Sequence, residues 1–165
     1  MKIFLIGFMG CGKTYTGKEL ASNIEYEFLD MDDEVINNAG KSIPDIFSEN
    51  GESVFREYER KALLNLLKKD NVVIATGGGA PCFADNMELI NKSGISVYLE
   101  MSPESLAKRL EHIKQTRPLV ASKKGEELGK FIAEKLWKRE PYYMKAHYIV
   151  SEKDINADYI QKLIF

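Results

Sequence analysis

The sequence is poor in cysteine, nearly neutral in net charge and free of long apolar runs. Its 165 residues include only two cysteines, Cys11 and Cys82, which are too few for a disulfide-stapled fold and are typical of a reducing compartment. The formal charge of −2, from 23 basic and 25 acidic residues, argues against a chain-wide basic surface for nucleic acid. No stretch reaches the roughly 18 apolar residues that a membrane-spanning helix needs.

The apolar amino-terminal segment, residues 1–12, has some features of a signal peptide. It is short, however, contains three glycines, and leads into Lys13 rather than into a small-residue cleavage site. We therefore expect a cytoplasmic protein that binds small molecules and neither nucleic acid nor membrane. Because no long exposed apolar stripe suggests an obligate partner, we also expect a monomer.

Strand-like and helix-like segments alternate along the chain, and the length fits one domain with a core of its own. Short apolar runs predict strands at 3–6, 28–29, 72–75, 95–99 and 148–150. Helical spacing predicts helices at about 14–24, 52–69, 86–92, 103–112, 126–138 and 157–163, whereas 35–50 has mixed character with several breaks. The alternation predicts a parallel sheet with helices on both faces. We assign the aromatic residues, Trp137 included, to the core.

A glycine-rich segment after the first strand carries the most specific signal. Residues 7–14 read GFMGCGKT and match the phosphate-binding pattern G-x-x-x-x-G-K-(S/T), with a strand before and a helix after. Glycines let backbone N–H groups curl around phosphate oxygens, and the start of the helix adds its dipole. Lys13 is expected to reach the β- and γ-phosphates and Thr14 to coordinate Mg²⁺. The alternative is a chance match, which we expect in on the order of one chain in a hundred.

Two carboxylates follow the second strand. Asp30 and Asp32 are two residues apart, so in an extended segment both side chains face the same way, across the mouth of the sheet. One of them can organise Mg²⁺-bound water, and the other can accept a proton from a substrate hydroxyl. The run continues with Asp33 and Glu34, so a solvated acidic turn is the plain alternative.

Arginines and glycines later in the chain are candidates for gripping an anionic substrate. Arg56 and Glu59 form an (i, i+3) pair, which is either a surface ion pair or an arginine oriented toward a substrate. Residues 77–79 are three glycines directly after a buried strand, where open α/β sheets place ligands, although a flexible loop has the same composition. Arg117 lies in a basic loop that is either a solvated segment or a lid. Arg139 ends a helix, where it satisfies the helix dipole or binds a carboxylate.

These motifs, considered as a set, resemble those of the shikimate kinase family. The segments that carry the resemblance are GFMGxGKT at 7–14, FxDxD at 28–32, GExxFRxxE at 51–59, TGGG at 76–79, RPL at 117–119 and RxPxY at 139–143. The resemblance implies an α/β fold of the P-loop, nucleoside-monophosphate-kinase-like type: a three-layer αβα sandwich with a five-stranded parallel sheet. It also implies a single domain over 1–165, with a substrate-binding insertion at about 31–60 and a lid at about 112–125.

The resemblance further implies ATP-dependent phosphorylation of the shikimate 3-hydroxyl, on the route to chorismate and the aromatic amino acids. On the acceptor side, Asp32 would hold or deprotonate that hydroxyl. Arg56 and Arg139 would bind the carboxylate of shikimate. Gly78 and Gly79 would contact its ring.

On the nucleotide side, the resemblance implies that Lys13 and Arg117 are catalytic residues, as Asp32 is on the acceptor side. Arg117 would stabilise phosphoryl charge from the lid. Mg²⁺ would be held by Thr14 directly and by Asp30 through water. Arg109 resembles a family position near the adenine. The residues expected to bind ATP are therefore Gly10, Cys11, Gly12, Lys13, Thr14, Tyr15, Arg109 and Arg117.

Two other functions compete with this hypothesis. Another small-metabolite kinase of the same fold, such as a gluconate kinase or a nucleoside-monophosphate kinase, would share the phosphate loop, but the paired arginines and the three glycines favour a small carboxylated polyol over a nucleotide. A nucleotide-binding regulator without turnover would not need the full set of catalytic side chains.

The sequence departs from the family pattern at two positions in or beside the loop: Cys11 and Tyr15 stand where the family more commonly has serine or threonine. The match weakens after Val150, which leaves the adenine contacts open.

Overall fold

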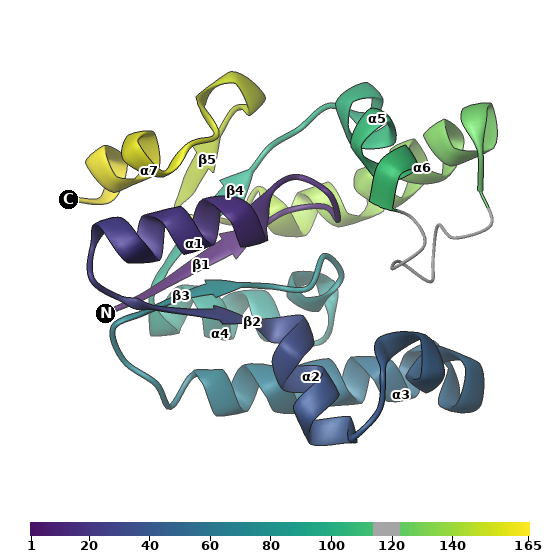
Figure 1. Ribbon diagram of the computed structural model, residues 1–165, viewed down its shortest axis with the longest axis horizontal. Coiled ribbons are helices and arrows are strands. Elements are labelled where there is room, and N and C mark those ends of the chain that lie inside the picture. Colours follow the sequence, from purple (N-terminus) through teal and green to yellow (C-terminus); the bar gives the residue numbers. More distant parts are fainter. Residues whose placement is uncertain (114–122) are drawn as a thin grey trace.

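The computed structural model describes residues 1–113 and 123–165, and within them a central parallel sheet lies between layers of helices (Figure 1). The sheet has five strands in the order β2-β3-β1-β4-β5, all of them parallel. These strands are β1 (Lys2–Ile6), β2 (Glu27–Asp30), β3 (Val72–Ala75), β4 (Ile95–Leu99) and β5 (Tyr148–Val150). The predicted three-layer α/β class is confirmed, since each of the first four strands is joined to the next by a helical crossover.

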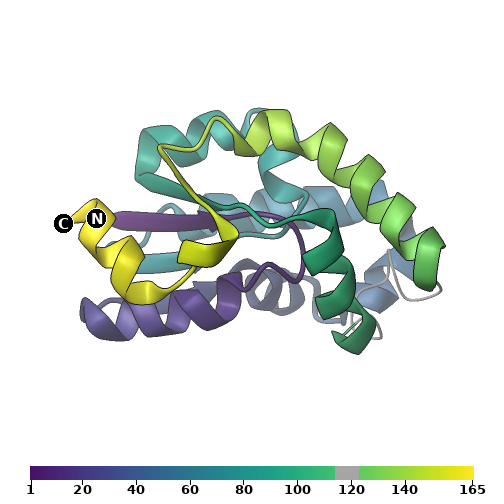
Figure 2. The ribbon, with the colours of Figure 1, turned by 90° about the horizontal axis from the view of Figure 1, so that it is seen from above.

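Helices cover both faces of the sheet, which explains why its central strands are nearly uninterrupted apolar runs. α1 (Lys13–Asn23) packs against α7 (Ala157–Ile164) on one face, and α4 (Asn86–Ser93) and α6 (Gly125–Tyr143) lie on the other (Figure 2). In the middle, Phe4 pairs with Ile74 of β3 and with Ser96 of β4. The side chains of Phe4 and Ile74 are fully buried, so the centre of the sheet is part of the hydrophobic core.

Two helical pairs extend beyond the carboxyl ends of the strands. α2 (Met31–Ala39) packs against α3 (Ile43–Leu66) beside the β2 edge of the sheet, and α5 (Pro103–Ile113), which follows β4, packs against α6 (Figure 1). Short 3₁₀ turns, η1 (Ala80–Cys82) and η3 (Glu152–Asp154), follow β3 and β5. Both chain termini lie at the opposite, amino end of the strands (Figure 2). Within the described ranges, no helix combines the length and apolarity needed to cross a membrane.

The predicted mixed character of residues 35–50 is wrong, because this stretch is largely helical. Asp30 caps α2 by accepting a hydrogen bond from the Asp32 N–H, and Ser42 caps α3 by accepting from the Asp45 N–H at 3.2 Å. Pro44 lies in the first turn of α3, where a missing N–H costs nothing. The helix is interrupted only at Gly51, whose φ of 81° departs from helical geometry. Gly40 ends α2 in a left-handed conformation, so this glycine and Pro44 lie at helix ends, where both residue types are favourable.

The structure also corrects two predictions about the helix α6. α6 extends to Tyr143, beyond the predicted end at 138, even though Pro141 lacks the N–H that would bond to the carbonyl oxygen of Trp137. Trp137 is 76% exposed on this helix, so its assignment to the core is wrong. An aromatic side chain on one turn of a helix faces the core only if the helix presents that side to the sheet.

Candidate active site

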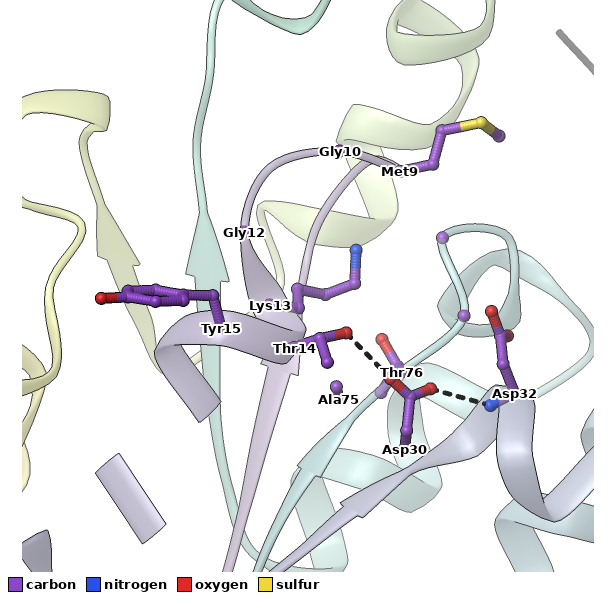
Figure 3. Close-up of a pocket in the computed structure, with 12 residues that line it drawn as sticks. Met9, Gly10, Gly12, Lys13, Thr14, Tyr15, Asp30, Asp32, Ala75 and Thr76 are labelled. Carbon is purple, nitrogen blue, oxygen red and sulfur yellow. Dashed lines mark hydrogen bonds between the residues drawn. The ribbon is translucent and has the colours of Figure 1, made fainter. Parts of the chain in front are cut away.

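The phosphate-binding loop joins β1 to α1 and curves around the ammonium group of Lys13. Lys13 is buried, and its Nζ donates to the carbonyl oxygens of Gly7 at 2.8 Å and Phe8 at 3.0 Å. Figure 3 shows the side chain pointing into the curve of the loop rather than out to solvent. Cys11 is fully buried and its Sγ lies 3.7 Å from Nζ, so this side chain packs beneath the loop. The ammonium group therefore stands where the backbone of the loop bends around it.

The predicted carboxylates meet the loop at the carboxyl end of β2. Thr14 Oγ1 donates to Asp30 Oδ2 at 2.8 Å, and Asp30 Oδ1 accepts from the Asp32 N–H at 3.0 Å (Figure 3). Asp32 lies in the first turn of α2 and not in an extended segment, so the predicted alternation is wrong in its local geometry. Both carboxylates nevertheless line the same pocket, because Asp30 ends the strand and Asp32 begins the helix.

These groups border one pocket of about 240 Å³ at the carboxyl ends of the strands. It brings together the phosphate loop, the two aspartates and the glycine turn after β3, which are far apart in the sequence. The lining residues are Met9, Gly10, Gly12, Lys13, Thr14, Tyr15, Asp30, Asp32, Ala75, Thr76, Gly77 and Gly78. The pocket lies beside β1, where the strand order changes direction, which is the place where open α/β sheets bind ligands.

The oxygens of Thr14 and Asp30 fit the requirements of Mg²⁺. This ion prefers hard oxygen ligands, and proteins typically hold it by one or two side chains while phosphates and waters complete the octahedron. The hydroxyl and the carboxylate are already adjacent, at 2.8 Å, and both border the pocket. The donor set is therefore adequate for a nucleotide-bound Mg²⁺.

The glycine turn packs directly on a buried ion pair from α3. Arg56 Nη1 donates to Glu59 Oε2 at 2.5 Å, and Arg56 Nη2 donates to Glu52 Oε1 at 3.0 Å. A side chain at Gly77 would collide with the Glu59 carboxylate, and one at Gly79 would collide with the Arg56 guanidinium. The absence of Cβ atoms therefore lets the turn pack closely on this ion pair, and a larger residue at either position would displace it.

Glu59 is almost completely buried, with 1% of its surface exposed, yet it is paired with Arg56. Burial raises the pKa of this carboxyl from 4.5 to about 7, although the charge of Arg56 partly opposes the rise. Asp32 raises the pKa further and Arg139 lowers it, so all four side chains belong to one electrostatic cluster. Of the two alternatives for Arg56 and Glu59, the surface ion pair is therefore wrong, because both side chains lie in the interior.

Arg139 reaches the other side of the same turn from the last part of α6. Its side chain is 6% exposed, and Nη1 lies 3.3 Å from the position that a Cβ on Gly78 would take. Its guanidinium also lies over the Phe8 ring, 5.3 Å from the ring centre. Among residues 1–113 and 123–165, Nη1 of Arg139 has no hydrogen-bond partner. A buried guanidinium with an unused donor is a site for an anion.

Two predicted nucleotide contacts lie on the outer side of the loop. Arg109, from α5, donates through Nη1 to the Gly10 carbonyl oxygen at 3.5 Å. Tyr15 is 71% exposed and points away from both aspartates, and its hydroxyl donates to Glu19 Oε1 at 3.0 Å (Figure 3). Arg117 and most of the predicted lid lie outside the described residues, so their role stays a prediction.

Sequence reasoning missed two residues of this site. Tyr143 donates from its hydroxyl to the Gly78 carbonyl oxygen at 2.5 Å, and Cys82 follows the glycine turn with its Sγ 3.9 Å from the Arg139 carbonyl oxygen. Burial raises the pKa of the Cys82 thiol to about 11, so this group stays a neutral thiol. The spacing of Arg139 and Tyr143, one helical turn apart, is the signal that could have placed Tyr143 beside the turn.

Comparison with known proteins agrees with this geometry. The chain matches the shikimate kinase family model over residues 9–164. It is 52% identical over 145 residues to a shikimate kinase of Parabacteroides distasonis, covering 88% of this chain and 84% of that protein. The crystal structure of shikimate kinase from Bacteroides thetaiotaomicron has a TM-score of 0.93 at 40% identity, covering 99% of this chain and 98% of that chain. The shikimate kinase of Acinetobacter baumannii in complex with shikimate has a TM-score of 0.90 at 37% identity, covering 99% and 92%.

Proposed function

The chain belongs to the shikimate kinase family, and from this premise we propose how its residues divide the transfer of a phosphoryl group from ATP to shikimate. The acceptor in this proposal is the 3-hydroxyl of shikimate. The products are shikimate 3-phosphate and ADP. The observation that carries the proposal is the buried Nη1 of Arg139, which has no hydrogen-bond partner in the described part of the chain and faces a turn of three glycines beside the phosphate loop.

The carboxylate of shikimate would be gripped by two guanidinium groups. Arg139 offers an unused donor, while Arg56 is held rigidly by Glu59 and Glu52. Bidentate binding by planar guanidinium groups suits a carboxylate better than lysine would. Gly78 and Gly79 lack side chains and so let the sugar-like ring approach the backbone. This arrangement favours a small carboxylated polyol over a nucleotide as the acceptor.

The reacting hydroxyl would lie between Asp32 and the phosphate loop. Asp32 is the carboxylate of the pocket that is not committed to Thr14, and it would hold the hydroxyl and accept its proton. Lys13 would leave the carbonyl oxygens of Gly7 and Phe8 to contact the β- and γ-phosphates. Mg²⁺, held through Thr14 and Asp30, would neutralise charge on those phosphates when bound.

The remaining assignments concern the nucleotide and the moving parts. The N–H groups of the loop would bind phosphate, Arg109 would lie near the adenine, and Arg117 would stabilise the transferring phosphoryl group from a lid at about 112–125. The segment at about 31–60 would be the substrate-binding insertion of a single-domain enzyme. We propose that the enzyme acts as a monomer in the cytoplasm, and sedimentation of the purified protein tests the oligomeric state.

The test is ADP release by the purified protein with Mg²⁺-ATP and one acceptor at a time. Shikimate, gluconate and AMP are compared at equal concentration, and the phosphorylated position on shikimate is identified by NMR. Turnover confined to shikimate, with the phosphate at the 3-position, is the expected result. Turnover on AMP instead would keep the phosphate site but overturn the carboxylate-binding roles of Arg56 and Arg139. Turnover on gluconate, which also carries a carboxylate, would overturn shikimate as the acceptor. ATP binding without turnover on any acceptor would indicate a nucleotide-binding regulator rather than a kinase.

A further inference from the structure

Two buried tyrosines lie in contact beneath the glycine turn, but they differ in what their hydroxyl groups bind. Tyr98 comes from β4 and Tyr143 from the end of α6, and their ring centres are 5.1 Å apart at an angle of 40°. Their exposed fractions are 1% and 0%. The Tyr143 hydroxyl donates to the Gly78 carbonyl oxygen at 2.5 Å, whereas the Tyr98 hydroxyl has no partner among the described residues. Of these two hydroxyl groups, therefore, only that of Tyr143 is hydrogen-bonded to the glycine turn.

The hydrogen bond from Tyr143 constrains one particular peptide unit. The peptide between Gly78 and Gly79 is trans and planar, so its C=O and its N–H point in opposite directions. Holding the Gly78 carbonyl therefore also holds the Gly79 N–H, on the side away from Tyr143. A peptide flanked by two glycines otherwise rotates readily, because no Cβ restricts either residue. In the part of the chain that is described, this N–H donates to no protein acceptor.

The same turn of α6 also carries the buried arginine. Arg139 precedes Tyr143 by one helical turn, and its Nη1 lies 3.3 Å from the place of a Cβ on Gly78. Burial raises the pKa of the Tyr143 phenol far above its usual range, so the hydroxyl remains a neutral donor at any working pH. The last turn of α6 therefore carries both Arg139, which lies beside Gly78, and Tyr143, which binds the Gly78 carbonyl oxygen.

We propose that Tyr143 is a positioning residue for the phosphoryl acceptor. Its hydroxyl holds the Gly78–Gly79 peptide so that the Gly79 N–H and the Arg139 guanidinium present their donors together to an anionic, hydroxylated ring. Tyr143 does not touch the substrate and acts through the glycine turn. The proposal rests on the proposed function, which assigns Gly78, Gly79 and Arg139 to shikimate. It does not involve the nucleotide, since ATP is assigned to the phosphate loop.

The test compares Tyr143→Phe with the matched control Tyr98→Phe. Each variant removes one buried hydroxyl and keeps the ring, but only the first removes a hydrogen bond to the turn. Steady-state rates are measured with shikimate varied at saturating ATP and with ATP varied at saturating shikimate. For Tyr143→Phe we expect the shikimate KM to rise about three- to tenfold, the loss of one buried hydrogen bond, with the ATP KM within about twofold of wild type. For Tyr98→Phe we expect neither to change by more than about twofold.

Partial unfolding does not obscure this comparison, because KM is independent of the concentration of active enzyme whereas the apparent kcat is not. An unchanged shikimate KM in Tyr143→Phe would overturn the proposal. Equal rises in both KM values, or the same rise in Tyr98→Phe, would also overturn it and assign Tyr143 a structural role. The wild-type protein is assayed first: no turnover on shikimate contradicts the proposed function, whereas normal wild-type turnover with a normal variant contradicts only the role of Tyr143.

Discussion

The stability of the protein should depend on pH through Glu59, and the direction of this dependence follows from its burial. The pKa of Glu59 is raised from 4.5 to about 7 in the folded state, chiefly by burial. Between these two values the folded protein keeps a proton that the unfolded chain has released. By linkage, the contribution of Glu59 is fully present below pH 4.5 and is lost as the pH rises through 7.

The size of the effect follows from the same two values. A rise from 4.5 to about 7 corresponds, at 1.36 kcal/mol per pKa unit, to about 3 kcal/mol of unfolding free energy. This is a large fraction of the 5–15 kcal/mol that is typical of a folded domain. Solvent screening does not reduce it appreciably, because only 1% of the residue is exposed. Glu59→Gln keeps the shape of the side chain and removes its titration.

The assay is urea unfolding of wild type and Glu59→Gln at several pH values between 4.5 and 8. We expect the free energy of unfolding of the variant, relative to wild type, to increase by about 3 kcal/mol across this range. Glu52→Gln is the matched control, since Glu52 binds the same Arg56 but its side chain is 48% exposed. The free energy of unfolding of Glu52→Gln, relative to wild type, should change by no more than about 0.5 kcal/mol across the same pH range. A constant difference between Glu59→Gln and wild type would refute the reasoning.

Three further substitutions test the proposed roles at the site. Lys13→Ala should lower kcat by roughly 10²- to 10³-fold with an unchanged circular dichroism spectrum, because it removes the ammonium group inside the loop, and near-normal turnover would contradict the phosphate role. Arg139→Ala should raise the shikimate KM about a hundredfold while the ATP KM changes far less, and equal losses for both substrates would remove Arg139 from the acceptor site. Asp32→Asn should depress the single-turnover rate by roughly 10²- to 10⁴-fold; if only the shikimate KM moved, Asp32 would be a binding group rather than a base.

Local patterns were enough to predict the sheet and the phosphate loop. The strands are continuous apolar runs, and such runs are informative because a parallel sheet buries both faces. The loop at residues 7–14 is recognisable because phosphate binding needs particular residues at consecutive positions. The helical residues at 31–50 were not predicted, because Gly40 and Pro44 were interpreted as breaks within a mixed segment, whereas Gly40 ends α2 and Pro44 lies in the first turn of α3.

Other properties arise only when distant segments meet. The sequence pairs Arg56 with Glu59, but only the close approach of the glycine turn buries Glu59 and raises its pKa. Tyr143 belongs to the RxPxY motif at 139–143, but the motif does not show which group its hydroxyl binds. Its contact with Gly78 joins residues 65 positions apart.

The sequence by itself therefore determined the α/β class, the phosphate loop and the family, because each depends on residues that are neighbours in the chain. The tertiary structure alone decided which charged groups are buried and which hydroxyl holds the glycine turn. Burial and hydrogen bonding between remote segments depend on how the helices pack across the sheet, and that packing has no counterpart in a local pattern.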